Sequence, residues 1–106
     1  MGGWVAVARQ EEIKPGEIRV VDIDDAQVAL INLDGEFIAI EDLCTHDGAE
    51  IASGCLIGEA IECPRHGARF CVRTGKVLAP PAYEPLHVFP VQLNDGVISV
   101  RDDRWD

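Results

Sequence analysis

Two short segments of the sequence each contain one cysteine and one histidine in close succession. The first is Cys-Thr-His at 44–46, and the second is Cys-Pro-Arg-His-Gly at 63–67. A [2Fe–2S] cluster in which two histidines replace two cysteines on one of its irons requires two thiolates and two imidazoles. The two segments supply this set, and the pattern predicts a protein that transfers electrons.

A workable arrangement places Cys44 and Cys63 on one iron and His46 and His66 on the other. Neighbouring ligands within one loop reach two adjacent irons more easily than they clamp a single metal. Each loop then bridges both irons. Because neither loop can form its half of the site alone, cluster binding and folding are expected to depend on each other.

Two other interpretations use the same four residues. Zinc accepts two cysteines and two histidines in a structural tetrahedral site, so ligand identity alone does not exclude it. Zinc modules, however, usually pair cysteine with cysteine and histidine with histidine, whereas each pair here is mixed. In the second interpretation the cysteines are ordinary buried thiols and the histidines ordinary surface residues. Four such residues in this order are improbable by chance. The spacing therefore favours the cluster.

The elements that must position these residues are predicted to be β-strands, because apolar and polar residues alternate in short segments and no helical repeat is sustained. Segments 28–33 and 36–40 flank Asp34-Gly35, a pair typical of a tight hairpin turn. A second hairpin is expected between 88–93 and 97–100, around Asn-Asp-Gly at 94–96.

Towards the N-terminus, segments 5–8 and 18–21 are predicted to form a strand pair separated by a turn at 14–17. Glycine and proline become frequent between residues 41 and 85, and all four cysteines fall there. We expect a single domain over 1–106, with a base of 1–40 and 86–106 and an inserted cluster-binding subdomain of 41–85.

At the four candidate ligands the chain resembles the Rieske family, whose signature is Cys-x-His followed by Cys-x-x-His. It is most similar to the small Rieske ferredoxins of bacterial ring-hydroxylating dioxygenase systems. The resemblance extends to Gly-Glu-Phe-x-Ala-Ile at 35–40, Ala-Arg-Phe at 68–70 and Thr-Gly-Lys-Val-Leu at 74–78. It implies a Rieske-like fold of antiparallel sheets with the cluster at its tip, and a proline-rich segment at 80–85 that covers the cluster.

The resemblance also implies a function. The chain would carry one electron at a time from a flavin-containing NAD(P)H reductase to a terminal non-haem iron oxygenase, and it would catalyse no substrate chemistry itself. Leu43, Pro64 and the exposed edges of His46 and His66 would form the docking patch. Two other roles share the ligand pattern: an accessory iron–sulfur protein in cluster assembly or in iron or redox sensing, and the small subunit of a nitrite-reductase-like enzyme.

Respiratory-chain Rieske proteins differ from this sequence at positions that affect the cluster. Their extra disulfide between the ligand loops corresponds to Ala49 and Arg65 here, so that bridge cannot form. Their serine and tyrosine hydroxyls near the cluster sulfurs correspond to Ala68 and Phe70. Because hydrogen bonds to the sulfurs stabilise the reduced state, we expect a potential at the low end of the Rieske range, near about −150 mV.

The remaining chemistry-bearing residues are expected to have no part in the cluster. Cys55 and Cys71 are predicted to be free thiols in a reducing compartment. His87, between two apolar residues, is interpreted as a packing or surface histidine. Trp4 and Trp105 are predicted to pack together across the base.

Composition narrows the choice of partners. The 106 residues carry a formal net charge of −10, which argues against nucleic acid and anionic membrane surfaces and favours a basic protein partner. An acidic surface can instead serve only to keep a small protein soluble. The sequence does not distinguish this role from the attraction of a basic partner. No apolar run is long enough to cross a bilayer and the first residues lack a secretory pattern, so we expect a cytoplasmic protein.

Overall fold

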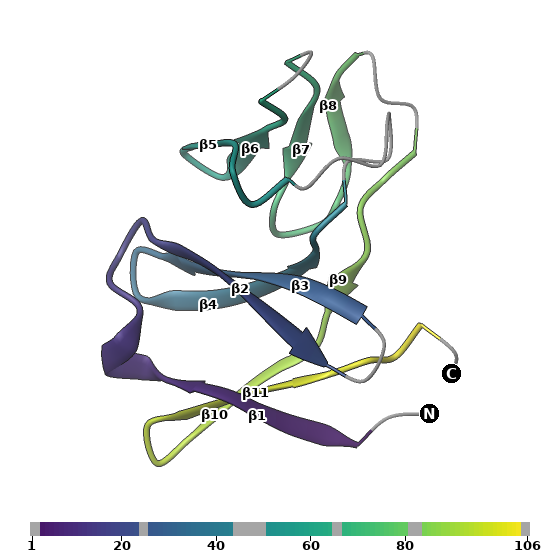
Figure 1. The fold of residues 1–106 in the computed structure, drawn as a ribbon. Coiled ribbons are helices and arrows are strands. Elements are labelled where there is room, and N and C mark those ends of the chain that lie inside the picture. The colour runs from purple at the N-terminus through teal and green to yellow at the C-terminus, as the bar shows by residue number, and fades with distance from the viewer. Residues whose placement is uncertain (1–2, 24–25, 44–50, 65–66, 81–83, 105–106) are drawn as a thin grey trace.

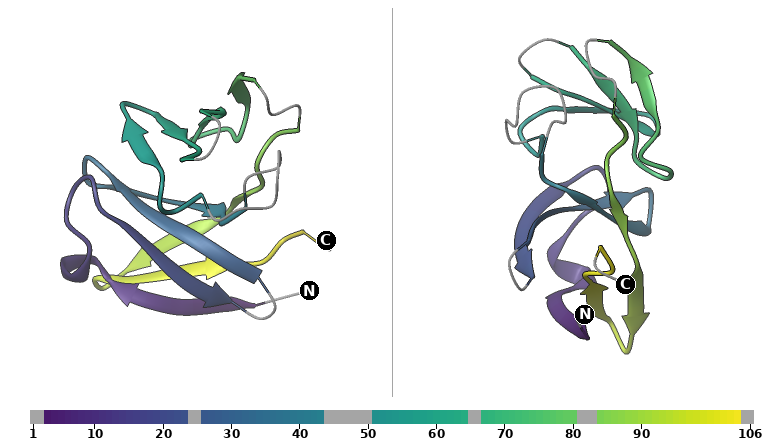
Figure 2. Two further views of the ribbon diagram at one scale, coloured as in Figure 1. Left: turned by 45° about the horizontal axis from the view of Figure 1, so that its top comes forward. Right: turned by 90° about the vertical axis from the view of Figure 1, so that its right-hand side faces the viewer.

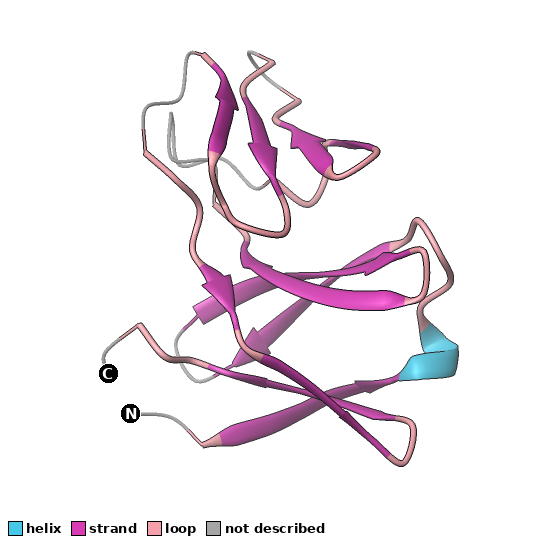
Figure 3. Cartoon of the chain, turned by 180° about the vertical axis from the view of Figure 1, so that it is seen from behind, coloured by secondary structure: helices cyan, strands magenta, loops and turns pink. Residues whose placement is uncertain are grey.

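The computed structural model of the protein describes residues 3–23, 26–43, 51–64, 67–80 and 84–104 (Figure 1). Within these ranges the chain consists of strands and one short 3₁₀ helix, η1 (Gln10–Glu12) (Figure 3). The strands are β1 (Trp4–Arg9), β2 (Ile18–Ile23), β3 (Ala26–Leu33), β4 (Glu36–Glu41), β5 (Cys55–Ile57), β6 (Ala60–Glu62), β7 (Arg69–Cys71), β8 (Val77–Ala79), β9 (Val88–Phe89), β10 (Val91–Asn94) and β11 (Val97–Arg101). The predicted all-β fold is confirmed, and no described helix has the length and apolar character needed to cross a membrane.

The strands form three antiparallel sheets arranged as layers (Figures 1 and 2). The lower sheet has the order β1-β11-β10, the central sheet β2-β3-β4-β9, and the upper sheet β5-β6-β7-β8. Strands from both ends of the sequence pair with each other in the lower and central sheets. The upper sheet is formed entirely by the stretch of chain between β4 and β9.

The central sheet is buried on both faces because its middle strand, β3, is apolar at successive positions. Alternate side chains of a strand point to opposite faces. Ala29 and Ile31 therefore join an apolar cluster shared with the upper sheet, while Val28 and Leu30 join one shared with the lower sheet. All four side chains are fully buried. The central sheet thus serves as a platform between the other two layers.

The predicted hairpin of β3 and β4 is confirmed. Its turn residues Asp34 and Gly35 have φ angles of 53° and 95°, the left-handed values that a two-residue hairpin loop requires. The buried side chain of Asn32 supports the turn by accepting a hydrogen bond from the Gly35 amide and donating one to the Ile13 carbonyl, both at 2.7 Å.

The predicted C-terminal hairpin is correct in position but wrong in detail. The single strand expected at 88–93 is two strands, β9 and β10, which belong to different sheets. Pro90 lies between them, and a proline, which has no amide hydrogen, interrupts regular strand pairing at this point. The loop of the hairpin contains two residues, Asp95 and Gly96, because Asn94 is paired with Val97.

The predicted pairing of segments 5–8 and 18–21 is wrong. β1 pairs with β11 in the lower sheet, whereas β2 pairs with β3 in the central sheet. The turn at 14–17 is present, with the Glu17 amide donating to the Lys14 carbonyl at 2.9 Å. The segment between β1 and this turn contains η1 and the buried Ile13. The Ile13 side chain packs between the lower and central sheets, and the chain passes from one sheet to the other along this segment.

A glycine allows a close backbone contact within the upper part of the molecule. Gly54 lies against the carbonyl group of Glu62, the last residue of β6, and a Cβ atom at Gly54 would overlap that oxygen. The Gly54 amide also donates to the Ile51 carbonyl at 2.9 Å. The absence of a side chain at this position lets the segment before β5 pack directly on the end of β6.

We therefore expect Gly54→Ala to be destabilising. The added methyl group forces two backbone segments apart, and overpacking of this kind costs about 1–3 kcal/mol of the free energy of unfolding. Chemical denaturation monitored by circular dichroism measures the change. Gly3→Ala is the matched control because a Cβ atom at Gly3 meets no other atom, and an equal loss of stability in both variants would refute the packing argument.

Candidate metal centre

Of the four predicted ligands, Cys63 lies within the described part of the chain. Cys44, His46 and His66 lie outside the described residues. Among the residues that are described, no group of three or more histidine, cysteine, aspartate or glutamate side chains is placed to hold a metal ion. The structure therefore describes the site through Cys63 and through the residues that flank the other three predicted ligands in the sequence.

Cys63 begins a closed backbone turn between β6 and β7. Its amide donates to the carbonyl of Ala68 at 2.7 Å, and the amide of Gly67 donates back to the Cys63 carbonyl at 3.2 Å. Gly67 has a φ of 77°, a value that favours glycine. Because both ends of the 63–68 segment are hydrogen-bonded to each other, the position of Cys63 is fixed by the strands on either side.

The environment of Cys63 is apolar. The residue is 1% exposed and belongs to the upper apolar cluster together with Ile51, Ile61, Ala68 and Phe70, all of which are fully buried. Such a setting limits the access of water to a metal-bound thiolate, and the hydrophobic shell of a metal site controls its dielectric and redox behaviour. The buried, unbridged thiol of Cys63 fits one of the four positions of a [2Fe–2S] cluster held by two thiolates and two imidazoles.

The first ligand segment leaves the central sheet at Asp42, just after β4. The Asp42 side chain is 5% exposed, and its Oδ1 atom accepts hydrogen bonds from the amides of Ile51 at 2.9 Å and Ala52 at 2.8 Å. One carboxylate oxygen thus connects the two ends of the segment that contains Cys44 and His46 in sequence.

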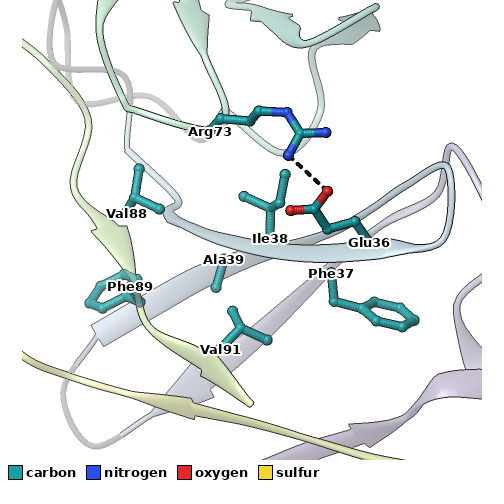
Figure 4. A pocket seen from close by; sticks show the side chains of 8 residues that line it. All are labelled: Glu36, Phe37, Ile38, Ala39, Arg73, Val88, Phe89 and Val91. Atoms are coloured by element: carbon teal, nitrogen blue, oxygen red, sulfur yellow. Dashed lines mark hydrogen bonds and ion pairs between the residues drawn. The ribbon is translucent and has the colours of Figure 1, made fainter. Parts of the chain in front are cut away.

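The upper sheet is tied to the central sheet by Arg73. Its Nη1 atom donates to Glu36 at 2.8 Å and its Nε atom to Glu59 at 2.7 Å, and both carboxylates raise the pKa of Arg73. Figure 4 shows Arg73 above β4, at the rim of a cavity of about 260 Å³ whose other walls include Ile38 and Val88. The contact of Arg73 with Glu36 links the upper part of the chain to the central sheet. Ion pairs that are exposed to solvent each contribute little to the free energy of unfolding.

The C-terminal segment closes on the end of β4. Arg104 makes a two-pronged contact with the buried Asp102, through Nε at 2.9 Å and Nη2 at 2.8 Å, and reaches Glu41 at 3.2 Å. This contact lowers the pKa of Asp102 to about 2. His87 Nε2 lies 2.6 Å from Asp103 Oδ1 and its ring packs edge-on against Phe89, so the predicted packing role of His87 is confirmed.

The two remaining cysteines form no disulfide in the described structure. Cys55 is exposed at the start of β5, and Cys71 is half-buried at the end of β7. A hydrogen bond with Thr74 lowers the pKa of the Cys71 thiol. The prediction of free thiols therefore agrees with the structure.

Several sequence predictions lie outside the described residues. These are the positions of Ala49 and Arg65, the packing of Trp105 on Trp4, and the centre of the proline-rich segment at 81–83. Gly54 and Asp42 were not predicted from the sequence. A short acidic side chain at the start of a glycine-containing loop is a known turn and loop stabiliser, and this signal could have drawn attention to Asp42.

Comparison with known proteins agrees with the site. The model of the Rieske [2Fe-2S] domain family matches residues 3–90. The biphenyl dioxygenase ferredoxin subunit of Pseudomonas sp. strain KKS102 is 46% identical over 84 residues, covering 78% of this chain and 77% of that protein. The 3-phenylpropionate/cinnamic acid dioxygenase ferredoxin subunit of Photorhabdus laumondii is 44% identical over 95 residues, covering 89% and 90%.

A solved structure is similar over the same extent. A chain in the complex of reduced oxygenase and oxidized ferredoxin of carbazole 1,9a-dioxygenase has a TM-score of 0.88 and 38% identity, with 92% of each chain covered. The relatives are named as ferredoxin subunits, which are electron-transfer components rather than the enzymes they serve. The family model, the identity of the relatives and the shared fold show that this chain belongs to the Rieske [2Fe–2S] domain family and is an electron carrier with a Rieske-type cluster.

Proposed function

We propose that the protein is the ferredoxin of an aromatic dioxygenase system. It takes one electron at a time from a flavoprotein that oxidises NAD(P)H and delivers it to a terminal non-haem iron oxygenase. The observation that carries this proposal is the alignment of this chain, over most of its length, with ferredoxin subunits of such systems. A similar ferredoxin in a solved complex with its oxygenase supports the choice of electron acceptor.

The proposed cluster ligands are Cys44 and Cys63 on one iron and His46 and His66 on the other. When bound, the cluster accepts and releases a single electron. The contribution of the described residues is positional: Cys63 is held in a closed turn, and apolar side chains surround it. The proposal treats residues 41–85 as the cluster-binding subdomain and residues 1–40 and 86–106 as its base.

Two exposed residues support a docking patch beside the ligands. Leu43, which is 36% exposed, precedes Cys44, and the exposed Pro64 follows Cys63. An apolar side chain next in sequence to each of these two cysteines offers a small dry contact for a redox partner, and weak electron-transfer interfaces are typically small. The net charge of −10 favours partner surfaces that are basic, because opposite charge accelerates encounter. The cytoplasm, as a reducing compartment, is consistent with the thiols of Cys55 and Cys71.

Substitution of the histidines tests the ligand assignment and the electron-transfer role together. We expect His46→Ala and His66→Ala to abolish the Rieske spectrum, because the iron held by the two imidazoles then loses one of its two protein ligands. Electron paramagnetic resonance of the dithionite-reduced protein measures the cluster, and the mixed site gives a lower average g value than an all-cysteine cluster. The rate of electron transfer from reductase to oxygenase is measured in parallel.

His87→Ala is the matched control, because His87 contacts Asp103 and Phe89 in the base and is not a proposed ligand. It should retain both the spectrum and the transfer rate. Normal spectra and normal rates in either ligand variant would contradict the assignment. A protein that binds the cluster and accepts electrons from the reductase, yet does not support turnover by aromatic-ring oxygenases, would favour the accessory iron–sulfur role instead.

Hydroxyl groups added near the cluster should raise its reduction potential. We expect the double variant Ala68→Ser, Phe70→Tyr to have a higher midpoint in protein-film voltammetry, because hydrogen bonds to cluster sulfurs stabilise the reduced state. Both side chains are fully buried, so the new hydroxyls have no bulk water to bind. Phe89→Tyr adds a hydroxyl at a buried position of the apolar cluster between the central and lower sheets, and it should leave the midpoint potential unchanged. A double variant with lower stability but an unaltered midpoint would defeat this explanation.

A further inference from the structure

Asp42 occupies an unusual position for an acidic residue. It is 5% exposed, and its own amide donates to the carbonyl of Gln27 in β3 at 2.9 Å, which anchors its backbone to the central sheet. Its Oδ1 atom accepts two hydrogen bonds from the consecutive amides of Ile51 and Ala52. The side chain therefore connects the central sheet to the point where the chain returns from residues 43–50.

The other carboxylate oxygen of Asp42 is not explained by packing alone. Oδ2 of Asp42 is buried and has no hydrogen-bond partner in the described structure. Burying a polar atom without a partner costs free energy, and each such atom in a folded protein calls for a specific explanation. A carboxylate at this site provides an acceptor strong enough to hold two amides at once, which a shorter or apolar side chain cannot do.

The same return segment is tied to the second ligand loop. Ile51, whose amide binds Asp42, is fully buried in the apolar cluster that contains Cys63. Its carbonyl accepts from the Gly54 amide, and Gly54 packs on the carbonyl of Glu62, which directly precedes Cys63 in the sequence. A short series of backbone contacts therefore leads from the Asp42 carboxylate to the start of the 63–68 turn.

We propose that Asp42 is a positioning residue for the cluster: its carboxylate holds residues 51 and 52 against the end of β4, and through them the backbone that leads to Cys63. The proposal rests on the ligand assignment given above, in which Cys44 and His46 lie in the sequence between Asp42 and Ile51. Asp42 is not one of the proposed ligands, and its expected effect is on how firmly the protein retains its iron.

Substitution of Asp42 in the cluster-loaded protein tests this role. In Asp42→Ala we expect the Ile51 and Ala52 amides to exchange hydrogen for deuterium at least about tenfold faster, since hydrogen bonds to a charged acceptor are lost. Loss of the visible cluster absorbance in the presence of an iron chelator should accelerate by a similar factor. Asp42→Asn keeps an Oδ1 acceptor at the same place and should restore both rates to within about threefold of the unsubstituted protein.

Asn32→Ala is the control for a merely structural effect. Asn32 is also buried and also makes two side-chain hydrogen bonds to the backbone at a turn, but it lies in the base hairpin. At a temperature where circular dichroism reports every variant as folded, Asn32→Ala should leave cluster loss and Ile51 exchange unchanged. Should Asp42→Ala fail to fold, Asp42→Ser, which removes the carboxylate but keeps a small polar side chain, is compared with Asp42→Asn in the same way.

The outcomes separate this proposal from the ligand assignment. If the unsubstituted protein shows the Rieske spectrum and Asp42→Ala loses its cluster no faster than Asn32→Ala, the role of Asp42 is overturned while the assignment stands. Equal effects of Asp42→Asn and Asp42→Ala would also overturn it, because the acceptor geometry would then be irrelevant. A chain that shows no Rieske spectrum at all would instead contradict the ligand assignment.

Discussion

The proposed ligand assignment requires two segments that are distant in the sequence to end next to each other, and Gly54 packs directly on the carbonyl of Glu62, the residue before Cys63. The contact has no room for a side chain. Asp42 holds the segment that arrives at Gly54, and Glu62 leads directly into the closed turn of Cys63. The proposed cluster site depends on this approach of two backbones.

The layered architecture explains how so small a protein can support that contact. β3 and β4 place apolar side chains on both faces of the central sheet, which lets one sheet hold the lower sheet and the upper sheet at once. Polar contacts then tie the outer parts to the platform. Arg73 links the upper sheet to β4, and Arg104 links the C-terminal segment to the residue that precedes Asp42. Rigid support of this kind is what a redox site needs, because it limits reorganisation around the metal.

The sequence predicted those features that depend on local chemistry. Asp34-Gly35 specifies its own hairpin through backbone conformation, and the mixed Cys-His pairs identify a cluster type through ligand preference. Prediction from the sequence failed where packing between distant segments decides which strands pair. Ile13 carries the chain across to another layer, so β1 pairs with β11 and not with β2. Asp42 and Gly54 were missed because their partners, Ile51 and Glu62, are defined only once the chain has folded.

The central claim is that two histidine nitrogens share one iron of the cluster, and pulsed electron paramagnetic resonance tests it most directly. The protein is produced with histidine labelled with nitrogen-15, reduced with dithionite, and its nuclear modulation is compared with that of unlabelled protein. Our account predicts couplings to two nitrogens that both change with the isotope, and that persist in His87→Ala. A reduced cluster without any coupling to histidine nitrogen, or with only one, would contradict it.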